Sequence, residues 1–355
     1  MNRLFTNYLS ALLLFFISVQ LWGQIPADYY NGIEGKKDKE LKTALYKIVT
    51  GSGFNVVGYN NLWNAYKSTD KRSDGKVWDM YSATSNFTFD VDKDGGSGGT
   101  TEGDKYNREH SFPQSWFENA TGVMKSDLFN AYPTDKLVNN KRSNYPYGET
   151  NGNSYKSNNG FSKLGSCTFE GYTGTVFEPN DEYKGDFARS YFYIATCYEN
   201  VFANMGGDMV AKNSYPGYKE WAVNLLLKWS RQDPVSKKET DRNNAVQKQQ
   251  KNRNPFIDYP QLVEYIWGDK KGQAFSFSPS AIDGTELSPV FVSMSEGKVK
   301  VETNDKVQVS VYNICGKLLA EGEGQFEIYL PATEKGILLV KVKSDLKVIT
   351  YKIRN

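Results

Sequence analysis

Residues 104–117 read DKYNREHSFPQSWF and contain the only histidine of this 355-residue chain, His110. Imidazole is the only side chain whose unperturbed pKa lies close to neutral pH, so this ring is the one obvious candidate for proton transfer. A carboxylate, Glu109, precedes it, and Pro113 is expected to end regular structure soon after it. A second polar run, VNNKRSN, occupies residues 138–144.

The composition is that of a globular chain without a dominant charge. The length allows one large domain or two ordinary ones, and 14% aromatic residues can build a sizeable core. A net charge of +2 neither demands nor excludes a polyanionic partner, so local patches must decide that question.

The first residues have the pattern of a secretion signal. Arg3 supplies a positive start, an apolar stretch runs from Leu9 to Trp22, and the expected cut lies near Gly23. The stretch is too short for a membrane span, and no other segment of the sequence reads as one. We therefore expect residues 1–23 to be a signal peptide and the mature chain to have no stable insertion in a membrane.

Three cysteines in an exported chain leave at least one unpaired. Cys167 and Cys197 fall in the same expected domain, so a disulfide between them is one interpretation. The other is that all three, including the distant Cys315, are buried small apolar residues. Their spacing fits no metal site.

Hydrophobic periodicity predicts a largely helical region followed by a small all-β region. A strand is expected at 76–82 and a loop at 90–104. The acidic start of this loop resembles a calcium loop, but its twelfth position is Thr101 instead of the expected Glu. The linker is expected at 275–289 and a β-sandwich at 290–355. Helices are expected at 37–50, 60–66, 186–204, around Trp221–Trp229, from Asp233 to Lys251, and between Pro260 and Gly268.

The residue types near His110 suit hydrolysis of a phosphodiester. The attacking water must lose a proton and the leaving oxygen carries charge, so a neutral imidazole and a divalent cation suit the two tasks. Mg²⁺ takes hard oxygen ligands, only one or two of them from protein. Glu109 and Asn139 are of that type. The Glu-His pair by itself is weak, because a partly buried structural histidine fits it as well.

Five separated elements together resemble the bacterial endonuclease I family of secreted nucleases, over roughly residues 35–270. They are REHSFP at 108–113; DL at 127–128 with Pro133, Asn139 and RSN at 142–144; EP at 178–179; KGDFAR at 184–189; and NRNPFI at 252–257. The resemblance implies an α+β fold, with a mixed helical nuclease domain at residues 24–274 built on a ββα-metal core and followed by the small all-β sandwich.

The same resemblance implies the roles of the site residues. Glu109 and Asn139 would bind one Mg²⁺, with Ca²⁺ or Mn²⁺ as possible substitutes, and His110 would activate the water. The products would carry 5′-phosphate ends. Some family members place an arginine between the histidine and the asparagine to hold the scissile phosphate, but this chain has none there. Arg142, Arg189 and Lys125 are the alternatives.

Contact with nucleic acid needs cations along the backbone track. Lys141 and Arg142, with Asn144, lie beside the expected metal ligand and are predicted to make this contact. Tyr145, Tyr147 and Trp116 are candidates for stacking on bases, with core packing favoured for Trp116.

The C-terminal region resembles a type IX secretion sorting domain. The matching stretches are VQVSVYNICGK at 307–317, IYLP at 328–331, KGILLVK at 335–341 and YKIRN at 351–355. The resemblance implies recognition by an outer-membrane secretion apparatus and a secreted or cell-surface location reached via the periplasm. A generic carbohydrate- or protein-binding sandwich is the alternative.

The first hypothesis is therefore a secreted Mg²⁺-dependent endonuclease of low sequence specificity that acts on DNA, with RNA as a second candidate substrate. The second is an exported nucleic-acid- or glycan-binding protein whose nuclease-like domain is inactive, which the missing arginine motivates. A different metal-dependent phosphodiesterase is a third and minor option.

Overall fold

The computed structural model describes residues 25–26, 28–51 and 53–277, and ten-residue or shorter segments between 291 and 354. The predicted signal peptide lies outside the described residues. The chain divides into two compact units between Phe277 and Ser278. Residues 275–277, which we assigned to the linker, pack on the first unit, because Phe275 is fully buried and exchanges backbone hydrogen bonds with Gly35 and Lys36.

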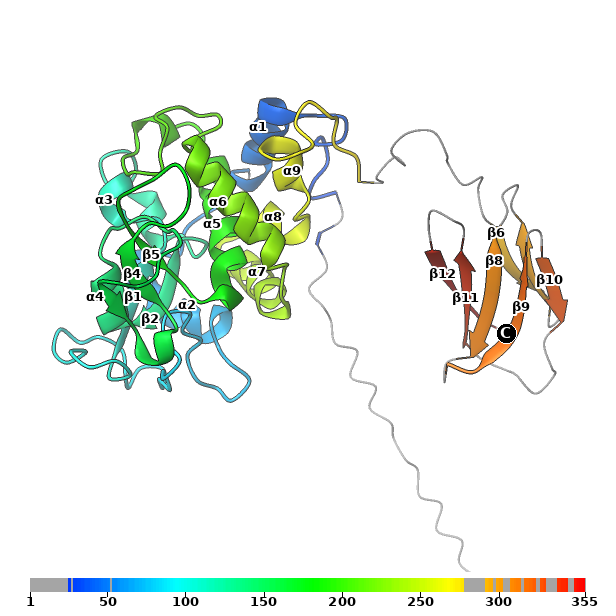
Figure 1. Cartoon of the computed structure of the whole chain (residues 1–355), viewed down its shortest axis with the longest axis horizontal. Coiled ribbons are helices and arrows are strands. Elements are labelled where there is room, and N and C mark those ends of the chain that lie inside the picture. The colour runs from blue at the N-terminus through cyan, green and yellow to red at the C-terminus, as the bar shows by residue number, and fades with distance from the viewer. Residues whose placement is uncertain are drawn as a thin grey trace, which may run out of the picture. The chain divides into compact units, whose positions relative to one another are not determined.

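The first unit is mixed helix and sheet, as expected (Figure 1). Its helices are α1 (Asp38–Val49), α2 (Leu62–Thr69), α3 (Gln114–Phe117), α4 (Lys136–Arg142), α5 (Lys184–Cys197), α6 (Glu220–Gln232), α7 (Lys237–Gln250), α8 (Pro255–Asp258) and α9 (Leu262–Ile266). Its strands are β1 (Tyr106–His110), β2 (Ala131–Asp135), β3 (Tyr155–Lys156), β4 (Lys163–Ser166) and β5 (Thr175–Glu178). Short 3₁₀ turns are η1 (Tyr59–Asn61), η2 (Val123–Ser126), η3 (Asn158–Gly160), η4 (Asp181–Tyr183) and η5 (Phe202–Asn204).

Helix α5 is the centre of this unit. All of its residues are buried, including the aromatic side chains that the sequence places around the whole helix. A helix that is apolar on every side must be covered on every side, and α1, α6 and α8 pack against it. The core is therefore unusually aromatic, with Phe187, Tyr191 and Phe192 in ring contact with neighbouring elements.

Strands β1 and β2 with helix α4 form the ββα unit that the sequence predicted. The strands are antiparallel, with Tyr106 opposite Asp135 and His110 opposite Ala131. The chain passes directly from β2 into α4, where the side chain of Asp135 accepts the N–H of Val138 at 3.0 Å and caps the helix. The unit lies at one side of the nuclease-like fold, and α1 and α9 lie at the other (Figure 1).

Several predicted elements are confirmed and some ends are wrong. The strand predicted at 76–82 is a series of bends, because the carboxylate of Asp79 accepts backbone N–H groups from Tyr81 and Asp135 in place of a strand neighbour. The helix predicted to reach residue 204 ends at Cys197. Helix α7 starts after Ser236 rather than Asp233, because Ser236 and Glu239 form a capping box.

Cys167 is half-buried and Cys197 is buried, and both are free thiols. The disulfide between them, one of the two interpretations of the sequence, is therefore wrong. Cys315 lies outside the described residues.

The second unit is a small antiparallel sandwich, as the alternating valines predicted. One sheet has the order β10-β7-β6 and the other β12-β11-β8-β9. Buried valines of β7, β8 and β11 meet between the sheets and form a core separate from that of the first unit. The strands are β6 (Phe291–Ser295), β7 (Lys298–Glu302), β8 (Gln308–Asn313), β9 (Leu318–Glu323), β10 (Phe326–Tyr329), β11 (Ile337–Lys343) and β12 (Val348–Arg354).

Candidate active site

Strand β1 presents two different chemical faces because side chains alternate along a strand. Asn107 and Glu109 point towards α4, where they meet Asn139 and Arg142. Arg108 and His110 point to the opposite face, where both lie against the ring of Tyr59. His110 is the last residue of the strand, opposite Ala131 of β2.

Glu109 is a buried carboxylate held at one oxygen. Its Oε1 accepts hydrogen bonds from Arg142 Nη1 at 2.7 Å and from the hydroxyl of Tyr81 at 2.9 Å. Its other oxygen, Oε2, accepts from neither side chain. Burial raises the pKa of Glu109 to about 7, against the opposing effect of Arg142 and Tyr81. The arrangement fixes the direction of the carboxylate and leaves Oε2 for another partner.

Asn139 lies one helical turn from Arg142 on the same face of α4, and it is half-buried. Its Nδ2 donates to the Oδ1 of Asn107 at 2.7 Å, which turns the amide so that its own Oδ1 is the free acceptor. A carboxylate oxygen and an amide oxygen therefore lie on facing elements, and both are ligands that Mg²⁺ accepts.

The donor set fits a cation that keeps most of its water. Among the described residues, there is no group of three or more His, Cys, Asp or Glu side chains able to hold a metal ion. Glu109 and Asn139 supply two protein ligands, the number that Mg²⁺ usually takes from protein. In the acidic loop, Asp90 pairs with Lys67 and Asp94 with Lys136, so these carboxylates are already neutralised by lysines.

His110 is held in one tautomer by the backbone. Its Nε2 lies 2.9 Å from the carbonyl oxygen of Lys125. Because a carbonyl oxygen only accepts, the proton is on Nε2 and Nδ1 carries the lone pair. The ring is 8% exposed, stacks on Tyr59 at 6.0 Å and meets the edge of Phe117.

The surroundings of His110 keep the imidazole neutral. Its pKa is lowered to about 4, mainly by burial and to a smaller extent by the nearby cations Lys125, Arg108 and Arg142, while the hydrogen bond with the Lys125 carbonyl acts in the opposite direction. At neutral pH the ring is therefore unprotonated and able to accept a proton, which is the state that a general base needs.

Two cations lie around Tyr59 on the His110 face. The Arg108 guanidinium is 3.6 Å from the ring centroid of Tyr59 and donates to its backbone oxygen at 3.0 Å. The Lys125 ammonium is 4.2 Å from the same centroid. Both side chains are half-buried rather than enclosed. Each is thus able to meet an anion beside the imidazole.

The two arginines that the sequence offered for the scissile phosphate are enclosed and paired. Arg142 is 1% exposed and donates to Glu109 and to the backbone oxygens of His110 and Ser111. Arg189 is fully buried and forms a bidentate pair with Glu239 at 2.6 and 2.7 Å. Arg142 thus contacts the candidate metal ligand, and the structure does not bring Arg189 to the site.

The end of α4 carries an exposed polar row. Lys141, Asn144 and Tyr145 are exposed, and Asn144 donates weakly to Ser115 at 3.4 Å. Ser143, between them, has φ 52° and ψ −125°, a conformation that normally selects glycine. A strained residue held in place by its surroundings is typical of a functional surface.

The sequence did not indicate the aromatic partners of the site. Tyr147, a predicted base-stacking residue, is fully buried, with its hydroxyl 2.7 Å from that of Tyr81 and its ring against Arg142. Trp116 is 8% exposed and packs on Phe112, as favoured. Tyr81 and Tyr59 lie far upstream of His110, where no local pattern marks them.

Comparison with known proteins agrees with this geometry. The family model described as Endonuclease I matches residues 37–261, which cover the ββα unit and α5. The chain belongs to the Endonuclease I family. Family membership makes it a phosphodiester-hydrolysing enzyme.

Several relatives of this Endonuclease I chain are named extracellular or periplasmic nucleases. An extracellular ribonuclease of Bacillus subtilis (strain 168) is 33% identical over 246 residues, which are 67% of this chain and 78% of that protein. The extracellular ribonuclease of Bacillus amyloliquefaciens is 35% identical over 247 residues, with the same shares covered. An extracellular deoxyribonuclease of Aeromonas hydrophila is 28% identical over 137 residues, 38% of this chain and 50% of that protein. In the described part of the chain, no helix is both long and apolar enough to span a bilayer.

Proposed function

We propose that this protein is a secreted Mg²⁺-dependent endonuclease that hydrolyses phosphodiester bonds of DNA and RNA with low sequence specificity. The observation that carries the proposal is the pairing of an oriented carboxylate, Glu109, with the amide oxygen of Asn139 on a ββα unit that ends in a neutral histidine. Relatives named ribonuclease and deoxyribonuclease support both substrate classes.

In this proposal each residue has a separate task. Glu109 and Asn139 would hold Mg²⁺, which would supply stabilisation of charge on the phosphate and the leaving oxygen. His110 accepts the proton of the attacking water at Nδ1, while the Lys125 carbonyl keeps the ring oriented through Nε2. Arg142 and Tyr81 favour the ionised form of Glu109, against the effect of burial, and fix the direction of its carboxylate. By family resemblance, the products carry 5′-phosphate ends.

Lys125 and Arg108 are proposed to hold the scissile phosphate in place of the missing arginine. Their cationic groups lie beside Tyr59 on the face that carries His110, and neither forms an ion pair with a carboxylate in the described residues. Arg142 and Arg189 are occupied by Glu109 and Glu239. The half-buried ammonium of Lys125 is a suitable phosphate ligand because it needs no fixed orientation.

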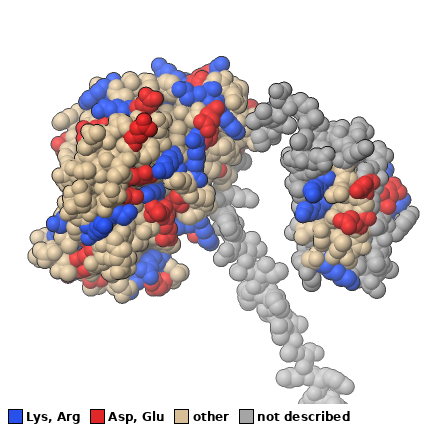
Figure 2. Space-filling model, in the orientation of Figure 1, with Lys and Arg blue, Asp and Glu red and all other residues tan. Residues whose placement is uncertain are grey.

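Low sequence specificity is expected because the proposed contacts are made to the phosphate backbone of the nucleic acid. Lys141, Arg142 and Asn144 were predicted to contact nucleic acid, and the exposed members, Lys141 and Asn144, are proposed to do so directly, with Tyr145 stacking on a base. Contacts to phosphate fix the position of a protein on its substrate but carry no sequence information. Basic and acidic side chains are interspersed over the face in Figure 2. We therefore expect nucleic acid to be attracted by small groups of basic residues rather than by one large positive surface.

The test is cleavage of plasmid DNA and structured RNA by the purified chain without residues 1–23. The wild type is expected to cut both with Mg²⁺ and to stop with EDTA. His110→Ala is expected to lower the rate by about 10²–10⁴-fold while keeping substrate binding. Binding that EDTA does not alter, with no cleavage under any metal condition, would instead support the exported binding-protein hypothesis.

The second unit is proposed to be a type IX sorting domain that directs the chain to the secretion apparatus. Its resemblance to that class and its separate core support this, and a sorting module needs no contact with the catalytic residues. Deleting residues 290–355 should retain the protein in the periplasm without changing the specific activity of the purified nuclease. Unchanged export after this deletion would refute the proposal.

A further inference from the structure

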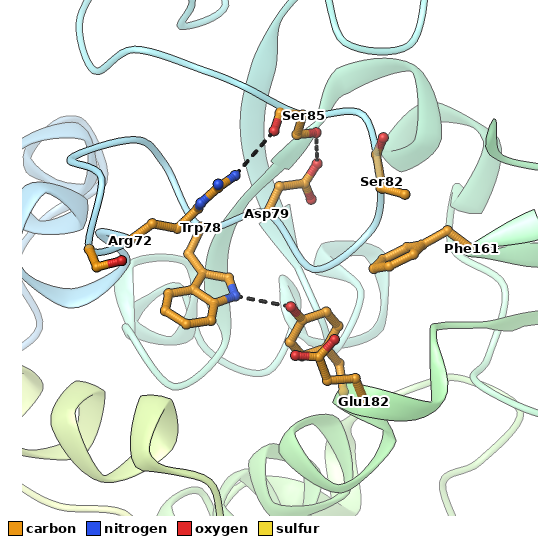
Figure 3. Close-up of a pocket in the computed structure, with 10 residues that line it drawn as sticks. Arg72, Trp78, Asp79, Ser82, Ser85, Phe161 and Glu182 are labelled. Carbon is orange, nitrogen blue, oxygen red and sulfur yellow. Dashed lines mark hydrogen bonds between the residues drawn. The ribbon is translucent and has the colours of Figure 1, made fainter. Parts of the chain in front are cut away.

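A second feature of the nuclease unit is a pocket on the loop that precedes β1. Its volume is about 260 Å³, and its walls include Arg72, Trp78, Asp79, Ser85, Phe161 and Tyr183. In Figure 3, Trp78 and Phe161 stand on opposite sides of the space, with Asp79 and Ser85 along a third side. None of these residues belongs to the site described above.

The aromatic walls are fixed in place. The indole Nε1 of Trp78 donates to the hydroxyl of Tyr183 at 3.1 Å, and the ring of Phe161 packs on Tyr183 with centroids 6.2 Å apart. Trp78 and Phe161 are half-buried, so each keeps surface towards the space. Fixed aromatic walls around a small opening suit a flat heterocycle, because stacking needs no further ordering of the side chains.

The polar side of the pocket offers hydrogen-bond acceptors. Asp79 Oδ2 accepts from Ser85 Oγ and from the N–H of Asp135, whereas Oδ1 accepts from the N–H of Tyr81 alone. A carboxylate oxygen has room for two donors, so Oδ1 keeps one position. At the mouth, the Arg72 side chain is 41% exposed and is held by Asp74 and the carbonyl of Ser85.

The same loop connects the pocket to the candidate metal ligands. Asp79 bonds to the backbone N–H of Asp135, the residue that caps α4, and α4 carries Asn139. Two residues after Asp79, the hydroxyl of Tyr81 bonds to Glu109. A group that fills the pocket therefore contacts the loop at Asp79, and this loop is hydrogen-bonded both to the start of α4 and to Glu109 of β1.

We propose that this pocket binds a single unpaired nucleobase of the substrate strand, at a fixed number of nucleotides from the bond that is cut. The inference rests on the proposed nuclease function. The volume admits one heterocycle and excludes a base pair, so a duplex must expose a base to use the pocket. The aromatic walls stack on any base, and the acceptor on Asp79 receives an N–H from its edge.

The test is a cleavage map of end-labelled single-stranded DNA that carries one abasic site, moved one position at a time. With the wild type and Mg²⁺, cutting at the phosphate a fixed number of nucleotides from the abasic site should fall about 5- to 150-fold, the loss expected for one base stack. Phe161→Ala should cut the intact strand more weakly and show no such local fall. Ala83→Trp should fill the pocket from an exposed lining residue, and it should also cut the intact strand more weakly and show no local fall at the abasic site. This second variant keeps the test informative if Phe161→Ala does not fold.

Phe277→Ala is the matched control, because Phe277 is also a partly exposed phenylalanine but lies outside the pocket. It should keep the wild-type map. The inference is overturned if the wild type shows no local fall, or if the fall persists in both pocket variants. Absence of Mg²⁺-dependent cutting of any strand by the wild type is a different result, and it would remove the proposed function itself.

Discussion

Tyr81→Phe tests how the candidate metal ligand is oriented. The change removes one hydroxyl that donates to Glu109 Oε1 at 2.9 Å and lies 2.7 Å from the hydroxyl of Tyr147. A hydrogen bond to a charged group contributes about 1.5–3 kcal/mol. Removing such a partner behind a metal ligand typically weakens metal affinity or activity about 10- to 100-fold. Arg142 still holds Oε1, so we expect the lower end of that range.

The assay is the rate of DNA cleavage as a function of Mg²⁺ concentration. For Tyr81→Phe the half-saturating Mg²⁺ concentration should rise about tenfold, with most of the maximal rate recovered at saturation. The control is Tyr193→Phe, since Tyr193 is also buried, donates to a carboxylate, Asp127, at 2.9 Å and has a second partner at 2.7 Å, but lies away from the site. Both variants should lose about 1.5–3 kcal/mol of stability. Equal shifts in both Mg²⁺ curves, or none in Tyr81→Phe, would refute the positioning role.

Four further outcomes follow from the structure. Lys125→Ala should lower the maximal rate about 10- to 100-fold and Lys125→Arg should restore much of it, whereas equal loss in both would argue against a phosphate contact. Arg189→Met breaks the buried pair with Glu239 and should lower the free energy of unfolding by about 3–5 kcal/mol in urea titrations, and cleavage lost at full stability would contradict this structural role. Because burial holds the pKa of His110 near 4, the maximal rate at saturating Mg²⁺ should change less than about twofold from pH 7 to 5.5, while an ordinary histidine would give about an eightfold fall. Ser143→Gly should raise the free energy of unfolding by about 1 kcal/mol, and a thermal melt that shows no gain would mean that the backbone there is unstrained.

The sequence predicted those parts of the site that are local in the chain. Glu109 and His110 are neighbours on β1, and the spacing from Asn139 to Arg142 is one turn of α4. Helix periodicity and strand alternation are set by neighbours along the chain, so they predicted the sandwich and most of the long helices. The ββα unit and the roles of Glu109 and Asn139 were instead implied by the resemblance of short motifs to the endonuclease I family.

The predictions that were wrong concern residues whose contact partners are distant in the sequence. From the sequence, Arg142 and Arg189 were both candidates for holding the phosphate. Whether a guanidinium is free to do so depends on which carboxylate the fold brings to it, and Glu239, the partner of Arg189, is fifty residues away in the sequence. The bends at 76–82 arise because Asp79 reaches the N-terminal end of α4. Local propensity cannot report such tertiary bonds, and it therefore predicted a strand.

The free thiols of Cys167 and Cys197 have a consequence for the folding of this protein. Disulfides form and persist in oxidising compartments and are rare in the cytosol, so a disulfide-dependent enzyme folds only after export. The catalytic unit here is stabilised by aromatic packing and buried ion pairs, with no covalent bond between these two sulfurs. Its fold, and with it the proposed nuclease activity, therefore does not depend on oxidation of this pair.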